Sequence, residues 1–159
     1  MFQVGQNLAG GSKDAQKIQR LQYSTFFVSG RMYGIDVSRV QEVVRPMPMT
    51  QIPLAEKFVK GLINLRGQVV TAISLHDLFS LKDSPGNDLM NVICKADGAL
   101  ASLLVDEIGD VIELESRSCE AVPNTIPESV RYYMTGVFKV GDDLMSVIDV
   151  DKIFKALNG

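Results

Sequence analysis

The chain has 159 residues, of which 46% are hydrophobic and 22% are charged, a composition typical of a folded globular protein. Its longest apolar runs are only a few residues, far below the roughly 20 that a membrane-spanning helix needs, so we expect no membrane insertion. The net charge is −3, and residues 86–159 hold thirteen acidic against six basic side chains, which argues against a nucleic-acid surface spread over the whole molecule.

The first residues offer few apolar side chains to bury. Residues 1–20 are therefore predicted to be a flexible segment, with a short helix at residues 13–21. The sequence does not open with a basic region followed by an apolar stretch, so no signal peptide is apparent and a cytoplasmic location is expected.

From residue 21 onward, apolar residues occur in short runs bounded by Gly, Asp, Asn or Pro, which is a pattern typical of strands. Two hairpins are expected to turn at Gly67 and Gly141, where glycine can adopt a positive φ. The ten expected strands lie near residues 22–29, 31–36, 49–52, 58–66, 68–75, 88–95, 99–105, 110–114, 133–140 and 143–149.

Helical patterns are short. Residues 38–42 are predicted to form one or two helical turns with Ser38 as the N-cap. Near the end of the chain, Val150, Ile153, Phe154 and Leu157 follow the i, i+3, i+4, i+7 spacing of an amphipathic helix. We expect this terminal helix to pack against the strands.

The chain contains an internal duplication. Five short strands per unit are too few for two separate sandwiches, so the sequence predicts an all-β fold of two small five-stranded barrels. The units are expected near residues 21–85 and 86–157, with an exchange of strands or a helix between them left open. An offset of 75 aligns residues 61–65 with 136–140 and 69–79 with 144–154, and an offset of 68 aligns 30–37 with 98–105.

The residues of a catalytic site are not apparent. His76 is the single histidine, and its neighbour Asp77 cannot complete a metal site alone, so a structural or surface role is expected. The adjacent carboxylates at residues 106–107 and 142–143 are interpreted as solvated edges rather than acid/base pairs. There is no P-loop or dinucleotide-binding fingerprint, so we expect neither an enzyme nor a nucleotide-binding protein.

No cofactor or metal is expected either. Cys94 and Cys119 do not have the spacing of metal ligands and are interpreted as packing residues. The aromatic residues, such as those at positions 26–27, lie inside apolar runs rather than among basic residues, which disfavours binding of nucleic acid.

One pair of charged residues stands out. Glu42 lies among valines, and Arg66 follows an apolar strand just before the turn at Gly67. Charges in apolar surroundings are costly unless they are paired, so a salt bridge between Glu42 and Arg66 is expected. The alternative, two unrelated surface charges, stays open from spacing alone.

Residues 33–36, 40–43 and 58–67 closely resemble the signature of the CheW chemotaxis coupling proteins. Residues 105–108 and 134–136 extend the resemblance through the second unit, so that it spans roughly residues 21–157 as a single CheW-like domain. The Asn-Leu-Arg-Gly segment at residues 64–67, preceded by Glu42 at this separation, is its most specific part.

The resemblance implies two five-stranded, SH3-like barrels and an adaptor that binds without catalysis. Its partners would be the CheW-like regulatory domain of the histidine kinase CheA and the helical tip of chemoreceptors, and the adaptor alone would be monomeric. Glu42 and Arg66 would form an ion pair that supports the signalling surface. The receptor would occupy an apolar groove between the barrels, lined by Val40, Val43, Gly61, Leu62 and Asn64.

Some residues depart from the family pattern. Thr71 stands where the family usually has Pro, and Ser74 stands where it has Asp. The connection at residues 117–127 is also unusual, and within it Glu120 and Ile126 are the candidates for contact with the kinase.

Other functions remain open at this point. The runner-up is a CheW-like scaffold of a divergent array with an output other than swimming. A ligand sensor or enzyme using the groove between the barrels, and a nucleic-acid-binding barrel, are less well supported because their characteristic residues are missing.

Overall fold

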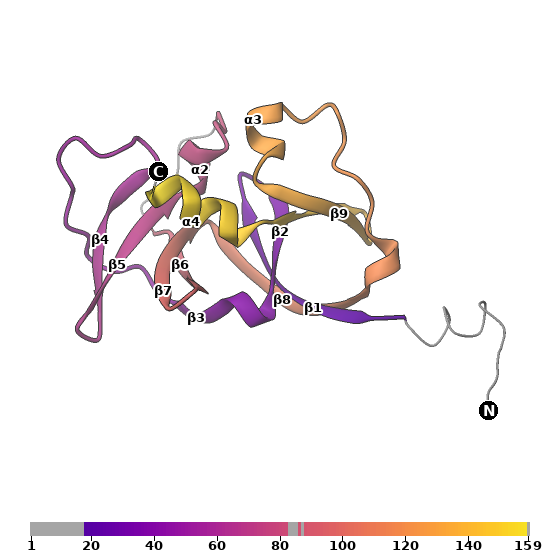
Figure 1. The fold of residues 1–159 in the computed structure, drawn as a ribbon, viewed down its shortest axis with the longest axis horizontal. Coiled ribbons are helices and arrows are strands. Elements are labelled where there is room, and N and C mark those ends of the chain that lie inside the picture. The colour runs from indigo at the N-terminus through magenta and orange to yellow at the C-terminus, as the bar shows by residue number, and fades with distance from the viewer. Residues whose placement is uncertain (1–17, 83–85, 87, 159) are drawn as a thin grey trace, which may run out of the picture.

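The computed structural model of the chain describes residues 18–82, 86 and 88–158 (Figure 1). In chain order the elements are β1 (Arg20–Val28), β2 (Arg31–Asp36), the 3-10 turn η1 (Val37–Arg39), β3 (Val40–Val44), β4 (Val59–Leu65), β5 (Gln68–Ser74), α2 (Leu75–Leu78), β6 (Met90–Ala96), β7 (Ala99–Val105), β8 (Glu107–Glu115), η2 (Ser116–Ser118), α3 (Glu128–Arg131), β9 (Met134–Val140), β10 (Asp143–Ile148) and α4 (Val150–Asn158).

The strands form two five-stranded sheets, which lie beside each other in Figure 1. Sheet 1 has the order β8-β1-β2-β10-β9, and sheet 2 has the order β3-β6-β7-β5-β4. Each sheet contains one parallel pair, β2 with β10 in sheet 1 and β5 with β7 in sheet 2. The predicted fold of two five-stranded β units with a terminal helix is confirmed.

The duplication seen in the sequence also appears in the strand order. Shifting every strand number by five changes the order of sheet 1 into the order of sheet 2. Each sheet nevertheless takes strands from both halves of the chain, because β1 and β2 join β8–β10 while β3–β5 join β6 and β7. A boundary near residue 85 therefore does not separate the sheets, and the division into subdomains stays a prediction.

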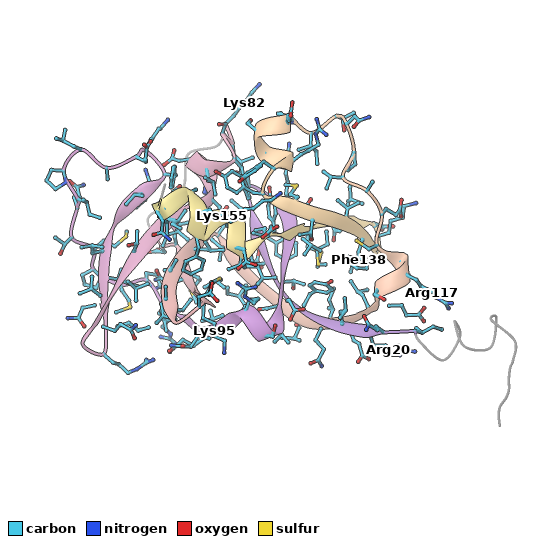
Figure 2. All side chains as sticks on the ribbon, in the orientation of Figure 1. Arg20, Lys82, Lys95, Arg117, Phe138 and Lys155 are labelled. Atoms are coloured by element: carbon cyan, nitrogen blue, oxygen red, sulfur yellow. The ribbon has the colours of Figure 1, made fainter. Side chains whose placement is uncertain are left out.

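Each sheet curls around an apolar core of its own. In sheet 1 the core includes Tyr23 and Phe138, and Figure 2 shows Phe138 within this half of the molecule. In sheet 2 it includes Ile63, Ile93 and Leu104. Side chains from all five strands meet in each core, which is the arrangement that a barrel-like curvature produces.

A third and larger apolar cluster lies between the sheets. It combines strand residues such as Phe26 of sheet 1 and Ile73 of sheet 2 with residues of α2, α3 and α4. In α4, the predicted amphipathic pattern is confirmed, because Val150, Ile153 and Phe154 are buried in this cluster. The buried apolar surface therefore ties the two sheets together.

Two of the predicted elements are wrong. Residues 38–42 are not a helix: only η1 is helical there, its cap is Asp36 rather than Ser38, and Val40 already begins strand β3. The valines of β3 pair with β6, and this tertiary pairing outweighs the weak helical pattern. Residues 49–52 are not a strand, since only Thr50 forms a bridge; the neighbouring prolines at 48 and 53 lack the N–H that a longer ladder needs.

The first residues of the chain are mostly outside the described part. The predicted flexible segment lies there except for residues 18–20, and so does the predicted helix at 13–21 except for its end, where Arg20 and Leu21 belong to β1 instead. No helix among the described residues is long and apolar enough to cross a membrane.

Candidate functional site

Glu42 and Arg66 form an ion pair through both oxygens of the carboxylate. Arg66 Nη1 donates a hydrogen bond of 3.0 Å to Glu42 Oε1, and Arg66 Nη2 donates to Glu42 Oε2. The Arg66 side chain is 66% exposed and the Glu42 side chain 27% exposed, so solvent screens the pair. The hydrogen bond from Arg66 lowers the pKa of the Glu42 carboxyl, so the carboxylate stays ionised to a lower pH than a free glutamate does.

This ion pair joins the two edges of sheet 2. Glu42 lies on β3, the first strand in the sheet order, whereas Arg66 follows β4, the last strand. The connection between β3 and β4 adds a second link, because Thr50 and Leu62 exchange backbone hydrogen bonds of 2.9 and 2.8 Å. An ion pair and a backbone bridge thus hold the edges of the curled sheet close together.

The turn between β4 and β5 sets the direction of the Arg66 side chain. Arg66 and Gly67 both have positive φ, 52° and 88°, as in the tight turns that suit the twist of a hairpin. The side chain of Asn64 accepts a hydrogen bond of 2.7 Å from the Gly67 N–H. Asn64, a predicted receptor-groove residue, therefore also stabilises the turn that presents Arg66.

Gly61, another predicted groove residue, lies where the β3–β4 connection crosses β4. A Cβ atom at this position would lie only 2.6 Å from the carbonyl oxygen of Thr50. At the duplicated position, Gly136, a Cβ atom would meet Cys119 Sγ first and would also lie 3.0 Å from the carbonyl oxygen of Glu120. Glycine at both positions is thus explained by a close backbone approach that the two sheets share.

The apolar groove candidates are placed on both edges of sheet 2. Val43 on β3 is 37% exposed, Val40 is half-buried against the central cluster, and Leu62 on β4 is half-buried. Three hollows formed by the described residues have volumes of about 750, 1070 and 470 Å³, and none of them is lined by these three side chains. A continuous receptor groove through these residues stays a prediction.

The two kinase-contact candidates lie in the connection between β8 and β9. The side chain of Glu120 is exposed, and its backbone pairs with Val137 at the edge of sheet 1. Ile126 is half-buried and lines the hollow of about 750 Å³ between sheet 1, α3 and the residues that follow α2. The two residues therefore lie on the same connection, but Glu120 faces solvent whereas Ile126 faces a hollow.

Comparison with known proteins gives a consistent result. A family model described as a CheW-like domain matches residues 22–158. This chain belongs to the CheW family. The chemotaxis protein CheW of Treponema pallidum is 28% identical over 143 residues, which cover 87% of this chain and 84% of that protein. The CheW of Helicobacter pylori is 27% identical over 156 residues, covering 98% and 94%.

A solved structure agrees with this family assignment. The scaffolding protein TtCheW from Thermoanaerobacter tengcongensis matches with a TM-score of 0.74 and 30% identity, covering 83% of this chain and 86% of that chain. This CheW-family protein is accordingly a chemotaxis coupling and scaffolding protein, and it acts as an adaptor without catalysis.

The residues that were considered for catalysis or metal binding have surroundings in this chain that fit structural roles. His76 is 3% exposed, and its Nε2 lies 3.2 Å from Asp106 Oδ2. Burial raises the pKa of the Cys94 thiol to about 12, so this thiol is not reactive at neutral pH, whereas Cys119 is exposed. No group of three or more potential metal ligands occurs among the described side chains.

Ser74, a predicted departure from the family pattern, caps a helix. Its Oγ accepts a hydrogen bond of 3.1 Å from the Asp77 N–H at the start of α2. At the duplicated position, Asp149 accepts a bond of 3.2 Å from the Lys152 N–H at the start of α4. Thr71, the other departure, keeps a backbone N–H on a strand that has neighbours on both sides.

The cap leads to a prediction about stability. Ser74→Ala is expected to lower the free energy of unfolding by about 1 kcal/mol, because the partly buried Asp77 N–H loses its partner. Urea unfolding checks this value. Ser118→Ala, at an exposed position, serves as the control and is expected to change stability by less than about 0.5 kcal/mol. Equal effects of the two substitutions would contradict the role of Ser74 as a cap.

Sequence reasoning missed an ion pair between Arg39 and Asp151 that links η1 to α4. A signal was present, because the offset of 75 residues places His76 opposite Asp151 and so marks the first turns of α2 and α4 as equivalent. The offset could not show that Asp151 pairs with Arg39 or that His76 lies beside Asp106, because these contacts depend on how the strands are exchanged between the sheets.

Proposed function

We propose that this chain couples the signalling tips of chemoreceptors to the kinase CheA by binding the receptor tip and the CheW-like regulatory domain of CheA. The coupling needs no chemistry: a receptor that changes state alters kinase activity through shared contacts. Weak individual contacts suffice, because many of them act together in an array.

The observation that carries the receptor part of this proposal is the Glu42–Arg66 pair. It fixes two edges of sheet 2 on an accessible surface, next to the exposed side chain of Val43. An amphipathic receptor helix could bury its apolar residues beside Val43 and Leu62 while the ion pair keeps the two edge strands in place. Val40 and Gly61 would support these strands from the less exposed side, and the exposed Asn64 would support the turn that follows β4.

The kinase part rests on the connection between β8 and β9. Glu120 offers an exposed charge there, and Ile126 lines a hollow with apolar residues such as Tyr33 and Phe79. A surface with a partly apolar hollow and a charged rim suits a protein partner. The protein would act in the cytoplasm as a monomer that is recruited to receptor arrays at the membrane.

An experiment on binding tests both parts. The purified chain is titrated with the isolated regulatory domain of the cognate CheA and, separately, with a soluble helical hairpin of a cognate receptor, and binding is followed by calorimetry. We expect saturable binding to both. Binding to neither partner would contradict the proposal. Binding to partners from a non-swimming array of the same organism, but not to the chemotaxis partners, would favour the divergent scaffold instead.

A further inference from the structure

Two contacts between side chains, called joints below, connect the two sheets. They occupy equivalent places in the two halves of the duplicated fold. The chain crosses between the sheets after β2, through η1, and again after β7, at Asp106. At each crossing a side chain contacts the first turn of a helix. At the first crossing this helix is α4, which follows β10, the parallel partner of β2; at the second it is α2, which follows β5, the parallel partner of β7. Arg39 in the first crossing pairs with Asp151 of α4, and Asp106 in the second lies against His76 of α2.

The first joint is held from two sides by Arg39. Its guanidinium donates from Nη1 to Asp151 Oδ2 at 3.3 Å and also from Nη2 to Asp151 Oδ1. Its Nε donates a bond of 3.1 Å to the carbonyl oxygen of Lys95, at the end of β6 in sheet 2. One side chain therefore links the first crossing to sheet 2 and to the helix that follows sheet 1.

The second joint uses Asp106 in an equivalent way. One oxygen of its carboxylate accepts a bond of 2.7 Å from the backbone N–H of Ser29, in the β1–β2 turn of sheet 1, and lies 3.2 Å from His76 Nε2. His76 follows sheet 2, so this joint also ties one sheet to the other. It differs from the first joint because His76 is buried.

The strand that follows the first joint is the one that carries Glu42. β3 begins at Val40, directly after Arg39, and it pairs with β6 alone because it lies at the edge of the sheet. Its pairing with β6 also shifts register between Val40 and Glu42. A short edge strand with a register shift has few hydrogen bonds to fix its position, so the anchor at its start matters more.

We propose that Arg39 is a positioning residue for the receptor-binding surface: by holding η1 against α4 and β6, it fixes the start of β3 and thereby the place of Glu42. This inference rests on the proposed function, since it assumes that the surface around Glu42 meets the receptor. The kinase candidates Glu120 and Ile126 lie in the connection between β8 and β9, outside η1 and β3, so we expect binding to the kinase to depend less on this joint than binding to the receptor does.

The test compares three single variants of the full chain and the double variant Arg39→Gln/Asp151→Asn. Arg39→Gln and Asp151→Asn each break the first joint, and Arg20→Gln breaks exposed contacts of 4.0 and 3.9 Å with Glu113 and Glu115 within sheet 1 as a matched control. The readouts are affinity for the receptor hairpin, affinity for the CheA regulatory domain, and hydrogen exchange of the backbone amides of β3 and β8.

Both joint variants are expected to bind the receptor hairpin about fivefold more weakly and the kinase domain as the wild type does. Their β3 amides should exchange faster, with β8 amides unchanged, and the double variant should lose no more than either single one. Arg20→Gln should leave both affinities and the exchange of the β3 amides unchanged. Unaltered exchange in β3, or an equal loss of both affinities, would overturn the positioning role.

If the wild type bound neither partner, the proposed function would fail. Hydrogen exchange of the β3 amides in the variants would still decide whether Arg39 positions this strand.

Discussion

Arg66→Glu is expected to reduce the receptor-dependent change in CheA activity by about tenfold or more. The substitution places a carboxylate beside Glu42, so the two edges of sheet 2 would repel each other where they are now joined. The measurement is phosphorylation of purified CheA with cognate receptor in membranes, in the presence of each form of the chain.

The charge swap Glu42→Arg/Arg66→Glu provides the control, because it restores an ion pair between the same strands. Recovery of coupling in the swap would show that the pair itself matters, whereas an equal loss in the single and the swapped form would contradict that role. The assay belongs at neutral pH. Because the folded-state pKa of Glu42 is lowered, the stability it contributes is present above the ordinary carboxyl value of 4.5 and is lost as pH falls through the lowered pKa.

Gly61→Ala is expected to lower the free energy of unfolding by about 2 kcal/mol. The added methyl group would lie 2.6 Å from the carbonyl oxygen of Thr50, and neither strand β4 nor the crossing connection can move without losing the Thr50–Leu62 bridge. Urea-induced unfolding measures the change. Receptor binding should weaken in parallel, because the bridge holds the edge of the same surface.

Gly86→Ala is the matched control for this substitution. Gly86 is exposed, and a Cβ atom there would meet no atom within 4 Å, so a change of less than about 0.5 kcal/mol is expected. If Gly61→Ala were as stable as Gly86→Ala but bound the receptor poorly, Gly61 would be a direct contact residue rather than a residue of the closure.

Much of the fold was predictable because the strands are local patterns. The hairpins at Gly67 and Gly141 were predicted from short apolar runs bounded by turn residues, and the predicted count of five strands per unit equals the number of strands in each sheet. The terminal helix was predicted from the spacing of Val150, Ile153 and Phe154, which are buried in the structure. Such signals depend on neighbours in the sequence, so the sequence shows them directly.

The exchange of strands was harder to predict. The duplication suggested two consecutive units, but β3 follows η1 into the other sheet, where it pairs with β6. The misassigned segment at residues 38–42 lies at this crossing. Its conformation depends on a partner strand some 50 residues away, and no periodicity within five residues can report that pairing.

The candidate site was predictable to a similar degree. A charged pair in apolar surroundings indicated Glu42 and Arg66, which the structure brings into contact. Arg39 gave no such indication, because its partner Asp151 is 112 residues away and both residues look like ordinary surface charges in the sequence. The close approach at Gly61 was also hidden, since it depends on the path of the β3–β4 connection over β4.

The coupling activity of the unmodified chain tests the central claim most directly. Purified CheA and cognate receptor membranes are assayed for kinase phosphorylation with and without the wild-type chain, at saturating and zero attractant. The account predicts that kinase activity responds to attractant only when the chain is present. An attractant response that is the same without the chain, or absent with it, would contradict its role as the coupler of this receptor and kinase.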